Sequence, residues 1–113
     1  MNAYIQKVND WFAVAGQLDA NDMKHVSEAG FKSVIINRPD YEAGPHQPPS
    51  DQVMQAARDA GMEVRYQPVI SGALTEADAI LFAQLLEQLP KPILAYCRSG
   101  GRCFNLFVMA SAV

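Results

Sequence analysis

The chain has 113 residues, of which half are hydrophobic and 19% are charged, with a formal net charge of −3. Such a composition can bury one core without disulfides or metal ions, so we expect a single domain over residues 1–113. The acidic balance, without any basic run, argues against a nucleic-acid partner. No stretch is long and apolar enough to cross a membrane and no signal-peptide pattern opens the chain, so we expect a cytoplasmic protein with reduced cysteines.

The first half of the chain alternates between predicted strands and helices. Residues 12–15 form a short apolar strand, and a helix is expected from residue 19 or 20 to Gly30. Residues 32–37 are β-branched and continuously apolar at their centre, which is typical of a strand covered on both faces. Residues 38–49 contain prolines and a glycine, so they form a long loop, and long loops in compact domains are often functional.

The second half continues the alternation. A helix is expected from Ser50, as its N-cap, to residue 60, followed by a strand over 63–69. Thr75 is a good N-cap for the longest helix, which Pro90 ends. The inward stripe of that helix is predicted to contain Ala77, Leu81, Leu85 and Leu89, widened by Phe82 and Leu86. The last elements are a strand over 92–97 and a helix over 104–110.

The order of these elements predicts an α/β fold. Strands that alternate with helices favour a three-layer arrangement, in which helices flank a mostly parallel sheet of four to five strands. Ligands in such folds bind at the carboxyl ends of the strands. Cys97 stands at the carboxyl end of the last predicted strand, which directs attention to the residues that follow it.

The loop after that strand reads CRSGGR, residues 97–102. A helix N-terminus and nearby arginines lower the pKa of a thiol, and both are expected here. The predicted anion-binding loop, which would wrap backbone N–H groups around the sulfur, consists of Arg98, Ser99, Gly100, Gly101 and Arg102. Arg102 can present a planar fork to two oxygens of an anion, whereas the Arg98 side chain is expected to point away. Cys97 and Arg102 are therefore the candidate catalytic residues.

Other candidate residues are less specific. Cys103 is interpreted as a small apolar filler of a buried helix, with a resolving thiol as the alternative. Arg38 ends the second predicted strand and could face the pocket, and Asp40 and Glu42 on the 38–49 loop could supply an acid. The possible pocket residues are thus Arg38, Asp40 and Cys103.

Metal and cofactor sites are not predicted. His25 lies on the polar face of a helix and His46 on a loop, and both are interpreted as solvated side chains. These residues are too far apart in sequence to assemble a metal site with the two cysteines.

Several short motifs along nearly the whole chain point to one family. They are GQL after the first strand, VIINRPD at 34–40, QPV at 67–69, LTEAD at 74–78 and AYCRSGGR at 95–102. With these motifs the chain resembles a family of small bacterial domains named for their occurrence beside β-lactamase-like hydrolases. The resemblance implies a fold like that of dual-specificity tyrosine phosphatases and a metallo-β-lactamase-fold protein as a partner.

Two departures from the phosphatase signature favour a different chemistry. Four residues instead of five separate Cys97 from Arg102, and Cys103 replaces the Ser or Thr that follows the arginine, so CRSGGR is similar to a rhodanese loop. The general-acid aspartate of phosphatases would fall within PVISGALT, residues 68–75, where Gly72 stands. An acid accelerates ester cleavage by roughly 10²–10⁴-fold, whereas sulfite or a thiolate leaves without a proton.

The main hypothesis is therefore a rhodanese-type sulfurtransferase without a cofactor. Cys97 would take sulfur from a small anionic donor, thiosulfate or a persulfide, and pass it from a Cys97 persulfide to a thiol. The first alternative is a phosphatase that acts on a phosphate ester through a phosphocysteine, with Arg102 holding the phosphoryl oxygens. The second is a non-catalytic anion-binding or partner-docking domain, which requires an ordinary thiol pKa at Cys97.

Overall fold

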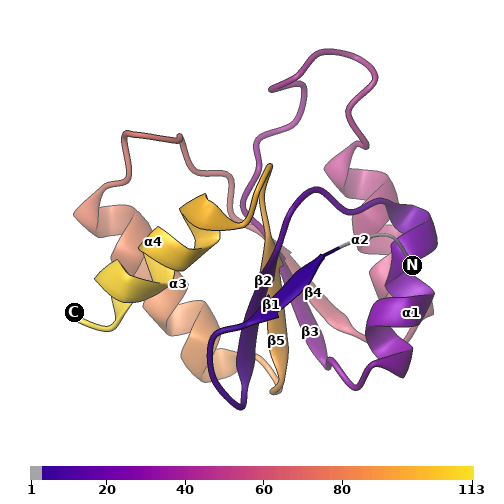
Figure 1. Ribbon diagram of the computed structural model, residues 1–113, viewed down its shortest axis with the longest axis horizontal. Coiled ribbons are helices and arrows are strands. Elements are labelled where there is room, and N and C mark those ends of the chain that lie inside the picture. The colour runs from indigo at the N-terminus through magenta and orange to yellow at the C-terminus, as the bar shows by residue number, and fades with distance from the viewer. Residues whose placement is uncertain (1–3) are drawn as a thin grey trace.

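The computed structural model describes residues 4–113 and has three layers, with a five-stranded sheet between two pairs of helices (Figure 1). The order across the sheet is β1-β2-β5-β3-β4. β1 pairs antiparallel with β2, and every other pairing is parallel. The strands are β1 (Ile5–Lys7), β2 (Phe12–Ala15), β3 (Ser33–Ile36), β4 (Glu63–Tyr66) and β5 (Ile93–Tyr96). The predicted α/β fold, with a mostly parallel sheet flanked by helices, is confirmed.

The helices cover both faces of the sheet. α1 and α2 lie on one face, and α3 and α4 lie on the other (Figure 1). Their bounds are α1 (Met23–Glu28), preceded by the 3₁₀ turn η1 (Ala20–Asp22), α2 (Ser50–Asp59), α3 (Glu76–Gln88) and α4 (Gly101–Ala110). Within residues 4–113, no helix has the length and apolar content needed to span a bilayer.

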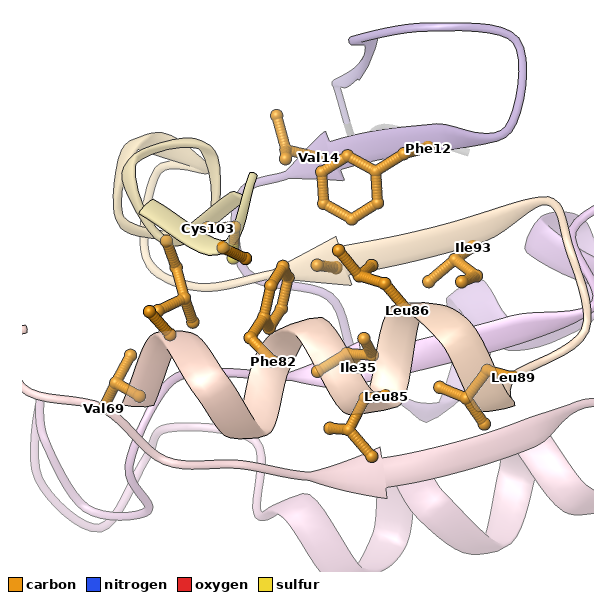
Figure 2. Close-up of a cluster of buried hydrophobic side chains, with 14 of the residues drawn as sticks. Phe12, Val14, Ile35, Val69, Phe82, Leu85, Leu86, Leu89, Ile93 and Cys103 are labelled. Atoms are coloured by element: carbon orange, nitrogen blue, oxygen red, sulfur yellow. The ribbon is translucent and has the colours of Figure 1, made fainter. Parts of the chain in front are cut away.

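The sheet divides the buried side chains into two cores, because successive residues of a strand point to opposite faces. On β2, Phe12 and Val14 belong to the core under α3 and α4, whereas Ala13 and Ala15 belong to the core under α1 and α2. Figure 2 shows the first of these cores, in which Phe12 meets the Phe82 ring edge-on at 6.0 Å. Cys97 and Cys103 also belong to this core, so tight packing fixes the base of the cysteine loop.

The main differences from the prediction concern the elements β1, β4 and α4. β1 is not predicted, because a three-residue edge strand gives almost no alternation signal. β4 ends at Tyr66 instead of residue 69, although the Gln67 and Val69 N–H groups still donate to the Ile36 and Asn37 carbonyls at 2.9 and 3.0 Å. α4 begins at Gly101, three residues before the predicted start, so Arg102 and Cys103 lie in its first turn.

The predicted cap of α3 is confirmed, but its predicted inward stripe is wrong in part. Thr75 and Asp78 form a reciprocal capping box. Ala77 and Leu81 are exposed, although both were expected to face inward. Each four-residue step rotates about 40° around a helix of 3.6 residues per turn, so a stripe at that spacing drifts off the sheet. The buried face is instead Ala79, Phe82, Leu85 and Leu86.

Candidate active site

The candidate site lies at the carboxyl ends of the parallel strands. The loops that follow β3, β4 and β5 meet there around one cavity of about 530 Å³. Its lining residues are Arg38, Glu42, Ala43, Ser71, Cys97, Arg98, Ser99 and Arg102. The sheet therefore brings together residues from three loops that lie far apart in the sequence. Arg98 is among the lining residues, and the prediction that its side chain points away stays a prediction.

Backbone hydrogen bonds hold the loop around Cys97. The Gly100 N–H donates to Cys97 Sγ at 3.1 Å, and the Cys97 N–H donates to the Ala15 carbonyl at 3.2 Å. Gly100 has a φ of 93°, and a Cβ there would lie 3.4 Å from the Ala15 carbonyl group. Both the backbone angle and the close approach favour glycine at this position. The predicted curl of residues 98–102 is thus present, and one N–H points at the sulfur.

The end of β2 supports the same loop from behind. The Gln17 N–H donates to the Arg98 carbonyl at 3.2 Å. A Cβ at Gly16 would lie 3.0 Å from that carbonyl oxygen, so a larger residue would push the loop outward. The GQL segment therefore serves as a backbone support for the cysteine loop.

Cys97 is a thiolate at neutral pH. Hydrogen bonding from the Cys103 thiol is the largest cause that lowers the pKa of Cys97, to about 5. Burial works in the opposite direction, and the backbone N–H groups of Cys103, Ser99 and Gly100 stabilise the anion further. The alternative of a non-catalytic docking domain requires an ordinary thiol pKa at Cys97. The lowered pKa of Cys97 does not meet that requirement.

Cys103 is fully buried and lies on the inner side of the loop. Figure 2 shows it among the apolar side chains packed between α3 and α4. Burial, and then the neighbouring Cys97, raise the pKa of Cys103, so this thiol keeps its proton and can donate it in a hydrogen bond. Cys103 does not line the cavity, so the predicted pocket position is corrected to a position behind the nucleophile candidate.

Arg102 is buried, with a side chain only 7% exposed. Its Nη1 donates to Glu42 Oε2 at 3.0 Å and to the Val69 carbonyl at 3.1 Å, and its Nη2 donates to Glu42 Oε1 at 3.0 Å. Its Nε is buried and has no acceptor among the described residues. The guanidinium thus has one edge fixed by the protein and one buried donor without a partner.

Glu42 joins two arginines. Arg38 Nε donates to Glu42 Oε1 at 2.9 Å, and Arg38 Nη1 donates to Gln17 Oε1 at 3.0 Å. The Arg102 hydrogen bond is the first cause that lowers the pKa of Glu42; burial opposes it, and Arg38 adds to the lowering. Glu42 is therefore a carboxylate that positions two guanidinium groups. Sequence reasoning missed this pairing, because nothing in the spacing connects residues 42 and 102.

Asp40 has a structural position instead of the predicted one in the pocket. Its Oδ1 accepts the Ser50 N–H at 2.8 Å and its Oδ2 accepts the Ser50 hydroxyl at 2.7 Å. The prediction of Ser50 as the N-cap of α2 is wrong: Pro49 occupies that position, and the carboxylate of Asp40 satisfies the helix end. Asp40 is thus held away from the lining of the cavity.

Three further polar residues, Asn37, His25 and His46, do not line the cavity. Asn37 is buried and its Nδ2 donates to the Gln67 carbonyl at 2.9 Å. His25 and His46 are exposed. Residues 4–113 contain no cluster of three His, Cys, Asp or Glu side chains that could hold a metal ion.

The loop between β4 and α3 presents Ser71 to the cavity. Gly72, where the phosphatase resemblance places an acid, is exposed and has a φ of 75°. Among the described lining residues, Glu42 is therefore the single carboxyl group, and two arginines hold it ionised.

Comparison with known proteins places this geometry in context. Residues 5–113 match the family described as "Beta-lactamase hydrolase-like protein, phosphatase-like domain". A β-lactamase hydrolase-like protein of Agrobacterium fabrum is 37% identical over 107 residues, which are 95% of this chain. The chain spans about a quarter of the length of the curated relatives that it matches.

Solved structures also resemble this chain. A candidate phosphatase from Neisseria meningitidis is 36% identical, with a TM-score of 0.84 over 91% of this chain and 72% of that chain. TpbA of Pseudomonas aeruginosa, solved in complex with phosphotyrosine, has a TM-score of 0.58 over 88% of this chain and 61% of that chain. At 14% identity, the second similarity shows the fold alone.

These comparisons overturn the sulfurtransferase hypothesis. Both the family description and the Neisseria structure name a phosphatase, and neither names a sulfur donor. One argument for sulfur transfer was the missing hydroxyl after Arg102, but the Cys103 side chain in its place is the largest cause that lowers the pKa of Cys97. Residue spacing alone therefore misidentified the chemistry.

Proposed function

This chain belongs to the phosphatase-like domain family of the β-lactamase hydrolase-like proteins, and we propose that it is a cysteine-dependent phosphatase. One observation carries the proposal. The ionised Cys97 and the buried Arg102, whose Nε lacks an acceptor among the described residues, line the same cavity. A thiolate beside a rigid cationic fork suits attack on a phosphoryl group, because the fork binds the oxygens around the phosphorus.

In the first step, the Cys97 thiolate attacks phosphorus and the leaving group departs, which forms a phosphocysteine. The Gly100 N–H and the other N–H groups at the start of α4 face the negative charge of the anion. Arg102 supplies its Nε to one phosphoryl oxygen, while Glu42 keeps the guanidinium in place. Donors fixed before the reaction stabilise charge without reorganisation.

In the second step, water attacks the phosphocysteine and Cys97 leaves as a thiolate. A thiolate whose pKa is about 5 is a good leaving group, and the Cys103 thiol stabilises it as it departs. We assign Cys103 to this positioning role through Cys97, since it does not line the cavity.

We further propose a phosphate ester as the substrate and a reducing compartment, the cytoplasm, as the location, because Cys97 has to remain a free thiol. The phosphotyrosine complex of TpbA supports a phosphate ester as ligand of this fold. A metallo-β-lactamase-fold partner stays a prediction.

The test is hydrolysis of an aryl phosphate by the wild type and by Cys97→Ser. We expect steady phosphate release, inhibition by vanadate, and a loss of more than about 10³-fold in the variant, because the hydroxyl is a far weaker nucleophile. Intact-mass measurement after rapid acid quenching should detect one added phosphoryl group on the wild type alone. Equal activity of the variant would overturn the proposal, and so would the absence of Cys97-dependent phosphate release from any phosphate ester or anhydride.

A further inference from the structure

The cleavage of a phosphate requires the leaving group to depart with its electron pair. When the leaving group is the oxygen of an alcohol, a proton donor lowers the barrier, and such a donor contributes about 10²–10⁴-fold. When the leaving group is a carboxylate or a phosphate, with pKa values of about 4 and about 6, it departs as a stable anion without a proton. The groups around the cavity therefore indicate which class of phosphate the site can cleave.

The carboxyl groups near the cavity are already engaged. Asp40 accepts two hydrogen bonds from Ser50, at 2.8 and 2.7 Å, at the start of α2. Glu42 accepts three hydrogen bonds from Arg38 and Arg102, all at 2.9 to 3.0 Å. A carboxylate between two guanidinium groups holds no proton to give at neutral pH.

Two further lining residues, Ser71 and Arg98, carry a hydroxyl and a cationic group. Ser71 lines the cavity from the loop after β4, and a serine hydroxyl does not act as an acid at neutral pH. Arg98 lines it from the cysteine loop, is exposed, and forms no ion pair with any described residue. A cation in this position stabilises a departing anion by charge.

The lining is also poor in apolar surface. Ala43 is the one non-polar side chain in it besides Cys97, and no aromatic ring lines it among the described residues. An aryl ester would find no aromatic ring in this lining and only the Ala43 methyl group to pack against. The lining suits a small, highly charged substrate.

We propose that the site, provided that it is the phosphatase site proposed above, acts on phosphoric anhydrides: acyl phosphates, or phosphates joined through a P–O–P bridge. Cys97 attacks the phosphorus of an acyl phosphate, the S–P bond forms, and the P–O bond to the acyl group breaks. The electron pair leaves with the carboxylate, and no proton is transferred. Water then attacks phosphorus, the S–P bond breaks, and the products are dihydrogen phosphate and the Cys97 thiolate.

The experiment compares kcat/KM of the wild type for acetyl phosphate, pyrophosphate, phenyl phosphate and glycerol 3-phosphate. Cys97→Ser supplies the blank for spontaneous hydrolysis. We expect one of the anhydrides to exceed phenyl phosphate by more than about 10²-fold and the alkyl ester by more than about 10⁴-fold, the range that an absent acid accounts for. The two anhydrides distinguish a carboxylate from a phosphate leaving group.

The outcomes separate this inference from the function on which it rests. Hydrolysis of phenyl phosphate or glycerol 3-phosphate at a rate equal to that of both anhydrides would overturn the inference and leave the phosphatase in place. No Cys97-dependent hydrolysis of any of the four would overturn both.

A variant of Glu42 tests directly whether this residue donates a proton to the leaving group. Glu42→Gln should change kcat/KM for the anhydride and the two esters by the same factor, because the carboxylate positions Arg102 in every reaction. A loss that grows with the pKa of the leaving group, reaching about 10²-fold or more on esters alone, would identify Glu42 as an acid and overturn the inference. The matched control is Glu63→Gln, which also removes a carboxylate that pairs with an arginine, at the exposed Arg65.

Discussion

Two segments, the cysteine loop and the 38–49 loop, form two walls of the cavity, and different contacts hold each of them in place. The cysteine loop is held by backbone hydrogen bonds to β2 and by glycines in close contact with it, whereas the 38–49 loop is held by side-chain bonds from Asp40 and Glu42. The first wall fixes a sulfur and its N–H donors. The second fixes the orientation of guanidinium groups. The position of the nucleophile therefore depends on backbone contacts between the cysteine loop and the end of β2, whereas the orientation of the two arginines depends on a side chain of the 38–49 loop.

The largest effect should come from the residue where the two walls meet. Arg102→Lys keeps the charge but loses the planar fork and the Nε donor, so we expect kcat/KM for an aryl phosphate to fall by roughly 10²–10³-fold. The control is Arg65→Lys, an exposed arginine paired with Glu63, which should retain wild-type activity. Near wild-type turnover by Arg102→Lys would show that a point charge is sufficient to bind the phosphoryl oxygens and would contradict the role given to the planar fork.

The cysteine loop can be weakened without touching the cavity lining. Cys103→Ala removes a hydrogen bond to a charged group, which is worth about 1.5–3 kcal/mol, so the pKa of Cys97 should rise from about 5. The alkylation rate of Cys97, measured against pH with iodoacetamide, should fall through that value in the wild type as the thiolate takes up a proton. In Cys103→Ala the same fall should occur at higher pH.

Cys103→Ser is the matched variant for this measurement. Its hydroxyl can donate the same hydrogen bond, so we expect an alkylation midpoint closer to that of the wild type than to that of Cys103→Ala. Identical midpoints in all three proteins would mean that the backbone N–H groups alone hold the thiolate.

A matched pair of glycines compares the two walls directly. Gly100 and Gly44 have nearly equal φ values, 93° and 94°, but only Gly100 would bring a Cβ within 4 Å of another atom. Left-handed backbone costs a non-glycine residue of order 1–3 kcal/mol, so both alanine variants should lose unfolding free energy in urea. Gly100→Ala should also lose activity, because its Cβ presses on Ala15 and displaces the N–H that faces Cys97. Equal activity of the two variants would show that the loop tolerates this displacement.

The smallest effect is expected from Asp40 on the 38–49 loop. Asp40→Ala removes the acceptor at the start of α2, and losing a helix cap costs about 1 kcal/mol of unfolding free energy. Cys97 alkylation should remain unchanged, since Asp40 is not among the lining residues. A shift in the alkylation midpoint would instead connect this carboxylate to the thiolate.

The sequence was sufficient for the four parallel strands, the cap at Thr75 and the curl after Cys97, because the apolar pattern of a strand, an N-cap and a tight loop each depend on residues close together in the chain. It was not sufficient for Glu42 or Asp40. Their partners Arg102 and Ser50 are set by how the 38–49 loop folds over the sheet, and no periodicity encodes that path. The sulfurtransferase prediction was wrong for a similar reason. Counting residues between Cys97 and Arg102 does not reveal that the Cys103 side chain lowers the pKa of Cys97.

The position of β5 has a consequence for how the molecule assembles. β5 is the last strand in the chain, yet it lies between β2 and β3 at the centre of the sheet. Until residues 93–96 have been synthesised, the β1–β2 hairpin and the β3–β4 pair have no shared neighbour to join them. Such long-range pairing forms late and slowly, because the intervening loops have to close first. The pKa of Cys97 is therefore lowered only in the completed fold, and an incompletely folded chain carries Cys97 as an ordinary, mostly protonated cysteine.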